Sequence, residues 1–389
     1  MLNTQFILHL TLIEGLTPSV IKKIIQSERS GVQTSDLYHL SAFDWMNYFG
    51  ISEKYAHILV AGLSDMVLLE KELDLIEEHA IKLLTIADEA YPELLKEIHM
   101  PPAVLYYLGQ AWPAAKRLAV VGARKGNEYG QRIINTIVPD LITSGYTIVS
   151  GGALGIDAMA HEAALQCGGK TIAILGSGLL KPYPSANKKL FTRIVENGGI
   201  VASPYPLMME GLPHNFPARN RIVTGLSQGC LVVQAAKKSG ALISAHCALE
   251  QGREVFAVPG AFDDELSAGC HEIIQQGAKL VMNSADILSE FGDRIMQPDT
   301  QLLKQQVLFF EAQSSLHSDR ASVTKQNKVT NISESQNKII TACKKQPISI
   351  EDIVIITQLS FEQIQSELFN LQLDGIVSQD FTGMWSAYL

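Results

Sequence analysis

Short, continuously apolar runs recur between residues 116 and 282, and longer segments that favour helices separate them. Runs of this kind are typical of strands that are buried on both faces of a sheet. The alternation of strand and helix therefore predicts an α/β domain with a doubly wound, mostly parallel sheet. The predicted strands are Leu118–Gly122, Thr147–Gly151, Thr171–Gly176, Ile200–Ser203, Cys230–Gln234, Glu254–Val258 and Lys279–Met282. The predicted helices include residues 127–144, 156–166, 185–197 and 239–251.

Residues 1–82 have a different pattern, that of several short helices. Gly15 is followed by Thr17-Pro18, and Gly50 is followed by Ser52, each time before an apolar run. A glycine that ends one helix and a hydroxyl residue that begins the next are common caps, and proline suits the first helical position. The pattern predicts a small helical domain of the helix-hairpin-helix or sterile-alpha-motif (SAM) type. Its acidic balance favours packing or protein contact over a grip on phosphates.

The end of the chain predicts a linker and a further small domain. Residues 293–335 contain no glycine and many Gln, Ser and Thr, which is typical of a linker. Residues 336–389 show the order of a winged helix, three helices and a hairpin, so the central domain would span 83–292. The predicted elements are Gln336–Lys344, Ser349–Thr357, Ser360–Asp374, Ile376–Ser378 and Met384–Ala387. With 3 basic and 6 acidic residues, this module is not expected to read DNA.

Charge is distributed unevenly along the chain, whose net charge is -9. Residues 1–80 hold 5 Lys/Arg and 11 Asp/Glu, or -6, whereas residues 116–260 hold 15 Lys/Arg and 8 Asp/Glu, or +7. A basic domain in an acidic protein is a candidate for binding a polyanion, although an uneven distribution by chance is the plain alternative.

Several classes of protein do not fit the sequence. It has no apolar run of the roughly 18 residues that a membrane helix needs. The N-terminus lacks a basic segment and Glu14 interrupts its apolar stretch, so no signal peptide is predicted. The 5 cysteines form no CxxC pair, which favours idle thiols in a reducing cytoplasm over a zinc site or disulfides.

Known nucleotide-binding loops are also missing. Gly169-Lys170-Thr171 resembles the end of a Walker loop, but position 164 is Ala and the segment enters a predicted strand instead of leaving one. No GxGxxG with a later acid follows the first strand. We therefore expect neither ATP nor NAD, and no cofactor at all.

The glycine loops after the predicted strands could nevertheless hold anions. Backbone N–H groups at helix N-termini favour negative charge, and ligands of such sheets bind beyond the carboxyl ends of the strands. One phosphate needs one such loop, whereas a row of loops fits a chain of phosphates; tight packing of helix on strand is the alternative use of these glycines. The candidate residues are Arg124, Ser150, Gly151, Gly152, Gly176, Ser177, Lys238, Ser239 and Gly240.

Residues 212–221 form the segment most suggestive of nucleic acid, since they hold two arginines, a histidine, two amides and a phenylalanine but no acid. Prolines on both sides predict that Phe216 lies in an extended segment. Arginines offer planar forks to phosphates, and a phenylalanine among them could stack on an unpaired base. A single strand therefore fits better than a duplex, with Phe216 as a plain core residue the alternative. The candidates here are Asn215, Phe216, Arg219, Asn220 and Arg221.

No catalytic or metal-binding group can be assigned from the sequence. Asp157 and His161 are four residues apart and would share a helix face, but no third ligand or nucleophile accompanies them. A helix cap and a core-facing or solvent-facing histidine are the simpler interpretation. The role of Glu250 stays open.

Many stretches in the same order resemble the DNA-processing protein A (DprA, or Smf) family. The matching stretches are Ala87–Leu95, Pro101–Tyr106, Val121–Arg124 with Tyr129-Gly130, SGGALGIDAMAH from Ser150, Ala173–Gly178 with Tyr183-Pro184, Asn215–Ile222, Ser239–Ile243 and Ala248–Val255 with Ala257–Gly260. The resemblance implies a Rossmann-like domain that binds single-stranded DNA without catalysis and dimerises through that domain. It further implies protection of incoming DNA in natural transformation and loading of the RecA recombinase.

The resemblance also implies roles for individual residues. Arg124 would hold a phosphate, Gly151 and Gly152 would offer amides, and Phe216, Arg219 and Arg221 would contact the backbone and a base. The chain departs from the family at Ser203-Pro204-Tyr205-Pro206, where an acid usually precedes Tyr-Pro. A helical domain in front and a winged helix behind agree with the family's architecture.

The enzyme alternative is a nucleotide-cleaving hydrolase on a related Rossmann-like fold. Nucleoside-monophosphate phosphoribohydrolases carry a PGGxGTxxE loop, and the corresponding place here is Lys237–Ile243, with the sequence KKSGALI. The glycine run and its paired acid are missing, so the sequence favours binding over hydrolysis.

Overall fold

The computed structural model describes residues 3–27, 34–110, 112, 116–293, 333–344 and 348–360, together with 363–364, 367–368, 371, 376–379 and 384–387. The chain divides into two compact units, Met1–Thr300 and Gln301–Leu389. The predicted linker, 293–335, lies almost wholly outside the described residues.

A nine-stranded sheet, in the order β1-β2-β6-β5-β4-β3-β7-β8-β9, forms the centre of the first unit. The strands from β6 to β9 in this order are parallel, whereas β1 and β2 add to the edge in antiparallel fashion. The α/β class and all seven predicted strands are confirmed. The strands are β1 Lys82–Thr85, β2 Val104–Gly109, β3 Lys116–Val121, β4 Tyr146–Ser150, β5 Thr171–Ile174, β6 Ile200–Ser203, β7 Gly229–Val232, β8 Glu254–Ala257 and β9 Lys279–Leu280.

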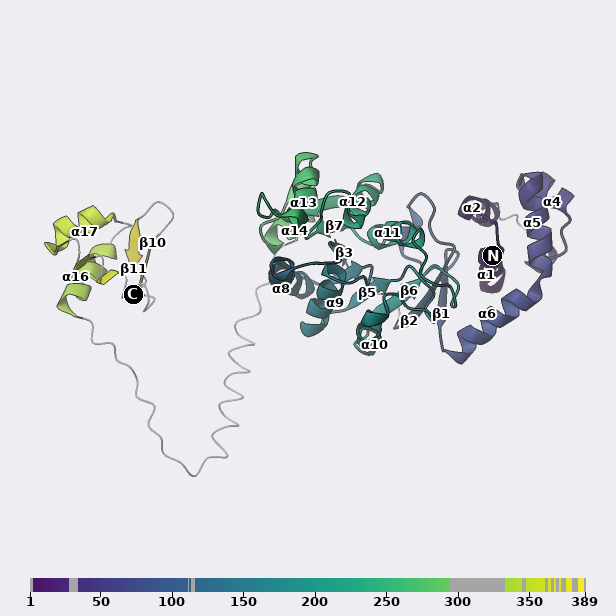
Figure 1. Cartoon of the computed structure of the whole chain (residues 1–389), viewed down its shortest axis with the longest axis horizontal. Coiled ribbons are helices and arrows are strands. Elements are labelled where there is room, and N and C mark those ends of the chain that lie inside the picture. The colour runs from purple at the N-terminus through teal and green to yellow at the C-terminus, as the bar shows by residue number, and fades with distance from the viewer. Residues whose placement is uncertain are drawn as a thin grey trace, which may run out of the picture. The chain divides into compact units, whose positions relative to one another are not determined.

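Helices cover both faces of the sheet, with α11 and α12 on one side of the strands and α9 and α10 on the other (Figure 1). They follow the strands as the alternating pattern predicts. Their bounds are α7 Glu93–Lys96, α8 Glu128–Thr143, α9 Ile156–Gln166, η1 Ser185–Asn187, α10 Lys188–Glu196, α11 Asn215–Gly225, α12 Gly240–Glu250, α13 Glu265–Gln275 and α14 Ser284–Glu290.

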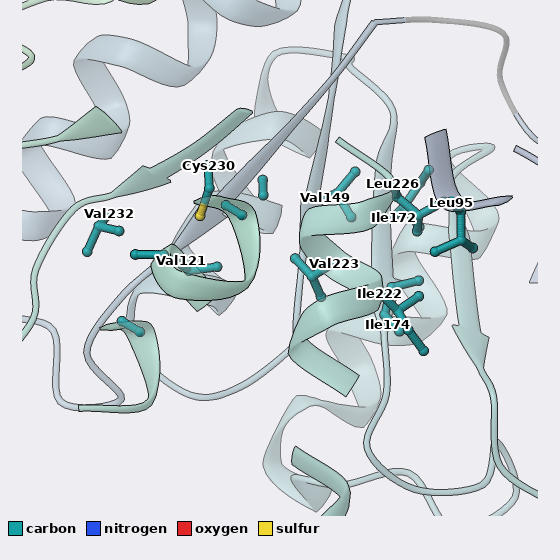
Figure 2. Packing of buried hydrophobic residues seen from close by; sticks show 14 of the residues in the cluster. Leu95, Val121, Val149, Ile172, Ile174, Ile222, Val223, Leu226, Cys230 and Val232 are labelled. Carbon is teal, nitrogen blue, oxygen red and sulfur yellow. The ribbon is translucent and has the colours of Figure 1, made fainter. Parts of the chain in front are cut away.

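Alternate residues of the central strands point into two separate cores. Ala119 and Val121 of β3 pack with α11, α12 and α13, whereas Leu118 and Val120 pack with α8, α9 and α14. In the first core, Ile222 and Val223 of α11 lie over Ile172, Ile174 and Val149 of the strands (Figure 2). Each buried branched side chain contributes roughly 1.5–3 kcal/mol, so these cores fix α11 on the sheet.

The segment around Phe216 is helical, not extended as the sequence predicts. Helix α11 begins at Asn215, which places Pro217 in its first turn. The N–H groups of a first turn have no partner within the helix, so proline costs nothing there. The flanking prolines therefore mark a helix start, and this difference decides where each side chain of the segment points.

The N-terminal part of the first unit is a helical bundle with its own core around Phe6, Trp45 and Leu59. Pro18 begins α2 and Gly50 ends α4 with φ +60°, as predicted. The bundle also joins the sheet domain, because the amide of Leu207 donates to the buried Glu72 carboxylate at 2.8 Å. The helices are α1 Thr4–Leu12, α2 Pro18–Gln26, α3 Thr34–Leu37, α4 Ala42–Phe49, α5 Glu53–Ser64 and α6 Met66–Glu78.

The second unit contains α16 Glu334–Cys343, α17 Ile350–Thr357 and a two-stranded sheet of β10 Val377–Gln379 and β11 Trp385–Ala387. Ile353, Leu368 and Trp385 belong to its core. These elements follow the predicted order, but part of the third helix lies outside the described residues, so the winged helix stays a prediction. Over the described ranges of both units, no helix combines the length and apolar character that crossing a bilayer requires.

Candidate nucleic-acid interface

A cleft of about 740 Å³ opens beyond the carboxyl ends of β3, β4 and β7. Strand β3 pairs with β4 on one side and β7 on the other, so the strand order reverses here. Doubly wound sheets bind their ligands at such a reversal. Seven of the predicted residues line the cleft, namely Arg124, Gly151, Phe216, Arg219, Asn220, Ser239 and Gly240.

The loops after β3 and β4 are fastened to each other at the floor of this cleft. The amide of Ile156 donates to the Ala123 carbonyl at 3.1 Å. Gly155, with φ +77°, lets the chains approach so closely that a Cβ there would lie 2.3 Å from the same carbonyl. Only glycine tolerates both the left-handed backbone and the close approach. The two loops therefore behave as one surface.

The amides of the SGGALGID loop have a partner within the chain. Asp157 Oδ2 accepts hydrogen bonds from the amides of Gly151 at 3.1 Å and Ala153 at 3.3 Å. Its side chain is buried, which raises the pKa of Asp157, while the nearby Arg219 charge opposes that shift. The sequence predicts that Gly151 offers its amide to a phosphate; in the structure a carboxylate of the same loop occupies it.

Arg219 is likewise buried beneath the cleft and does not reach its rim. Its guanidinium donates to the carbonyl of Gly151, which directly follows β4, and to that of Ile174, which ends β5. Burial lowers the pKa of Arg219 to about 10, and the Asp157 carboxylate opposes the shift. Arg219 thus ties α11 to two strand ends, a structural role where the sequence predicts a DNA contact.

Arg221 points away from the cleft altogether. It donates to the Met100 carbonyl and lines a separate cavity of about 260 Å³ against α2. Phe216 and Arg221 are five residues apart, about 140° around a helix, so the helical form of this segment points their side chains in different directions. Asn220 stays at the cleft, where its side-chain amide donates to the Gly240 carbonyl at 3.3 Å.

Five other predicted residues are buried with internal roles, contrary to the expectation that they contact a ligand. Ser150 donates to the Val120 carbonyl at 2.6 Å, and Ser177 accepts from the Tyr183 amide at 3.1 Å. Asn215 is buried, and its side-chain amide lies 3.6 Å from Met209 Sδ. The remaining two are Gly152, which packs against Phe191, and Gly176, which packs against Phe216.

Phe216 lies at the mouth of the cleft and is only half-buried, which disfavours its being a plain core residue. The Arg124 guanidinium carbon lies 5.4 Å from the centroid of its ring, within cation–π distance. The ring of Tyr183 lies 5.3 Å from the same ring at 49°. Tyr183 is not among the site residues predicted from the sequence, although it closely follows Gly176.

Positive charge gathers around this mouth. Arg124 and Lys125 are exposed on the cleft, while Lys237 and Lys238 are exposed beside the start of α12. Ser239 and Gly240 open that helix toward the cleft, so its N-terminal amides add to the positive potential. Among the described residues that line the cleft, Asp157 is the sole acid, and its charge faces buried amides. The surface suits a polyanion.

The pair of Asp157 and His161 does not form a catalytic arrangement. The His161 ring is buried, and its Nδ1 lies 2.7 Å from Thr171 Oγ1. Burial lowers its pKa to about 3, so the ring is neutral at physiological pH. The described residues also contain no group of three or more His, Cys, Asp or Glu side chains placed to hold a metal.

The fold and the cleft define a class of protein: a Rossmann-like α/β protein with a basic, aromatic-lined cleft at its topological switch point. The family model described as DNA recombination-mediator protein A matches residues 82–292. Protein Smf of Synechocystis sp. is 36% identical over 322 residues, which cover 78% of this chain and 80% of that protein. The chain therefore belongs to the DNA recombination-mediator protein A (DprA/Smf) family, as the sequence resemblance predicts.

Two further comparisons agree. DNA processing protein DprA of Streptococcus pneumoniae is 45% identical over 211 residues, which cover 53% of this chain and 73% of that protein. The X-ray structure of DprA from Streptococcus pneumoniae superposes with a TM-score of 0.63 at 36% identity and covers 75% of this chain and 99% of that one.

Proposed function

We propose that this protein binds single-stranded DNA without sequence preference and acts in the cytoplasm as a recombination mediator. In this role it would protect incoming DNA during natural transformation and load RecA onto it. The family description and the names of its DNA-processing relatives support this proposal. Binding without catalysis is part of it, so release of free base from a nucleotide by the purified protein would contradict it.

The observation that carries the proposal is the contact of Arg124 with Phe216 at the mouth of a basic cleft. A cation for a phosphate, in contact with the aromatic pair of Phe216 and Tyr183 for a base, matches the two parts of a nucleotide in a single strand. Neither group reads a base edge, so no sequence preference follows. A duplex keeps its base faces stacked and would meet only the cations.

The strand would run from the rim of Arg124 and Lys125 to the start of α12. Asn220 lines the cleft and donates a hydrogen bond to the Gly240 carbonyl at the α12 end. Gly240 is exposed, and a Cβ there would meet no atom within 4 Å, so a phosphate has room beside the helix start. Lys237 and Lys238 continue the positive charge beyond it.

A titration of fluorescent oligonucleotides, single-stranded against double-stranded, at two salt concentrations tests the proposal. We expect tighter binding of the single strand and a steep loss of affinity with salt, because bound cations release counterions from DNA. Equal affinity for both forms, or none for either, would overturn it.

The protein would act as a homodimer, and an exposed apolar groove indicates the surface. A groove of about 1180 Å³ lies between α12 and α13, and Ile243, Phe262 and Leu280 line it with exposed side chains. Phe262 is 96% exposed, a costly arrangement for an isolated chain. We place the second copy on this groove of the Rossmann-like domain.

Sedimentation of Phe262→Glu against wild type tests the dimer. Because Phe262 buries almost nothing within one chain, the variant should fold normally and sediment as a monomer. Leu249→Glu is the matched control, since Leu249 is 68% exposed on α12 but does not line the groove. A monomeric wild type, or a dimeric Phe262→Glu, would refute this surface.

A further inference from the structure

A second cavity, of about 260 Å³, lies where the helical bundle meets the sheet domain. Helix α2 forms one wall, and α11 forms the other together with the loops at residues 101–104 and 204–205. The described residues that line it are all different from those of the cleft. Junctions of this kind commonly hold small ligands, and sites for drug-sized molecules measure roughly 300–1,000 Å³. This cavity therefore suits a smaller molecule.

The lining of this cavity is mostly apolar, but it carries positive charge that nothing in the wall balances. Lys22 of α2 and Arg221 of α11 line it from opposite sides. None of the described residues in the lining is an Asp or a Glu. A cation that leaves water without meeting an opposite charge costs free energy. The cavity is thus electrostatically suited to a ligand with a negative charge.

Arg221 is half-buried, and burial lowers the pKa of its guanidinium. The charges that act on it come from Tyr205, Tyr91 and Cys247. Burial raises the pKa of each of these three groups, so all are neutral at physiological pH and none replaces a carboxylate. Within the described part of the chain, the guanidinium makes one hydrogen bond, from Nη1 to the Met100 carbonyl. The rest of its planar fork is open to the oxygen atoms of a ligand.

The backbone that orients Arg221 is strained. Met100 has φ +116°, a region that residues other than glycine rarely adopt, and Pro101 follows it directly. Such a conformation is unfavourable and persists only where the surrounding structure enforces it. Met100 also contacts the bundle, because the Ser19 hydroxyl of α2 donates to its Sδ at 3.3 Å. The direction of the Arg221 fork is therefore fixed at the junction before a ligand arrives, as tight binding requires.

We propose that this cavity binds a small organic acid, with a single carboxylate on a short aromatic or branched apolar body. The carboxylate would accept hydrogen bonds from Arg221, with Lys22 as a second cation. The apolar body would lie against Ile21, Ile25 and Ile222, which line the same space. A phosphate monoester fits less well, because its second charge would meet prolines and aliphatic side chains. No residue of the DNA cleft takes part, so the site is independent of the proposed function.

Ligand-observed NMR and calorimetry on the full chain test the site. The probes are benzoate, phenylacetate and 3-phenylpropionate, each compared with its neutral amide. At least one acid should bind about tenfold or more tightly than its amide, since hydrogen bonds between ionised groups are the stronger ones. Arg221→Met should lose this preference and Lys22→Met should reduce it. Arg132→Met is the charge-matched control and should keep it, because Arg132 is exposed on α8 and does not line the cavity.

Ala218→Phe tests the location without removing a charge. Ala218 is exposed on α11 and lines the cavity, so the variant should keep the melting temperature of the unliganded wild type while its ring blocks the acid. Three results would each overturn the site: no binding of any of the acids by wild type, equal binding of acid and amide, or undiminished binding of the acid by Ala218→Phe. Retention of the preference by Arg221→Met would likewise refute the role of its guanidinium.

Discussion

The carboxylate of Asp157 accepts a hydrogen bond from the amide of Gly151 at 3.1 Å, beneath the cleft. A Cβ on that glycine would lie 2.7 Å from both Asp157 Oδ2 and Arg219 Nη2, so the two buried charges meet at one backbone position. The loop that resembles a phosphate-binding loop is thus held by the protein's own charges, so the proposed binding of DNA would use the rim above it.

Removal of the Asp157 charge should destabilise the fold strongly. Asp157→Ala leaves the buried Arg219 guanidinium without its opposite charge and frees two amides, at a cost of about 3–5 kcal/mol. Urea unfolding measures the change, and Asp157→Asn, which keeps an acceptor oxygen, should lie between Asp157→Ala and wild type. A loss no greater than that of an ordinary surface substitution would contradict this structural role of Asp157.

The two arginines of the candidate site should behave differently. Arg124→Ala removes an exposed cation and its contact with Phe216, so it should lower the free energy of unfolding by no more than about 1 kcal/mol. It should weaken single-strand binding about tenfold or more and lower the salt slope by about 0.7. Arg219→Lys should instead lower the stability, since an ammonium cannot span the carbonyls of Gly151 and Ile174 as a guanidinium does.

Oligonucleotide titrations and urea unfolding on both variants separate these effects. Lys170→Ala is the charge-matched control, because Lys170 is exposed before the start of β5, at the end of that strand away from the cleft. Equal losses of affinity in Arg124→Ala and Lys170→Ala would indicate a general charge effect and would argue against a specific site.

Two glycines of the candidate site, the buried Gly176 and the exposed Gly240, should respond in different ways to alanine. Gly176→Ala would force the Phe216 ring from its place and cost roughly 1–3 kcal/mol in overpacking. Gly240→Ala enters open space at the start of α12, so stability should change by less than about 0.5 kcal/mol while single-strand affinity falls. Thermal unfolding measures the stability of both variants, and titration measures their affinity for single-stranded DNA. Unchanged affinity in Gly240→Ala would argue against a contact between the start of α12 and the DNA.

Stability should decrease in acid because His161 is buried in its neutral form. Its pKa is lowered from 6.5 to about 3, so the unfolded chain binds this proton more readily than the folded one. The contribution of neutral His161 to the free energy of unfolding is complete above pH 6.5. It falls as the pH drops toward 3, at up to roughly 1.4 kcal/mol per pH unit. The difference between wild type and His161→Gln, followed by urea unfolding across this range, isolates it; a difference that does not vary with pH would contradict the assignment.

The parallel strands were predictable because each is an apolar run with both faces buried, and hydrophobicity alone marks such runs. The edge strands β1 and β2 were not found, since Lys82 is exposed and Gly109 is only half-covered, so the apolar pattern weakens there. The start of α11 was missed because proline next to Phe216 favours two opposite interpretations, an extended segment or a first helical turn.

The candidate site was predictable in place but not in detail. From residue type alone, Arg124 and Arg219 are equally good candidates for a DNA contact. In the structure Arg124 is exposed, whereas Arg219 is buried under the strand ends. Whether a polar group faces a ligand or a neighbouring carbonyl depends on the helix phase of α11, which the pattern of residues 212–221 did not reveal. Tyr183 was missed because its loop has no periodicity and holds one basic residue, Lys181.

The position of β3 between β4 and β7 has a consequence for how the cleft can be lost. Its two walls come from segments far apart along the chain, and they adjoin only because the central strand pairs on both sides. A proteolytic cut or a truncation between α10 and α11 would leave neither product with both walls of the cleft, so neither would bind the ligand even weakly. The proposed binding of single-stranded DNA should therefore be lost in a single step when the sheet unfolds, and no fragment shorter than the whole α/β domain should retain it.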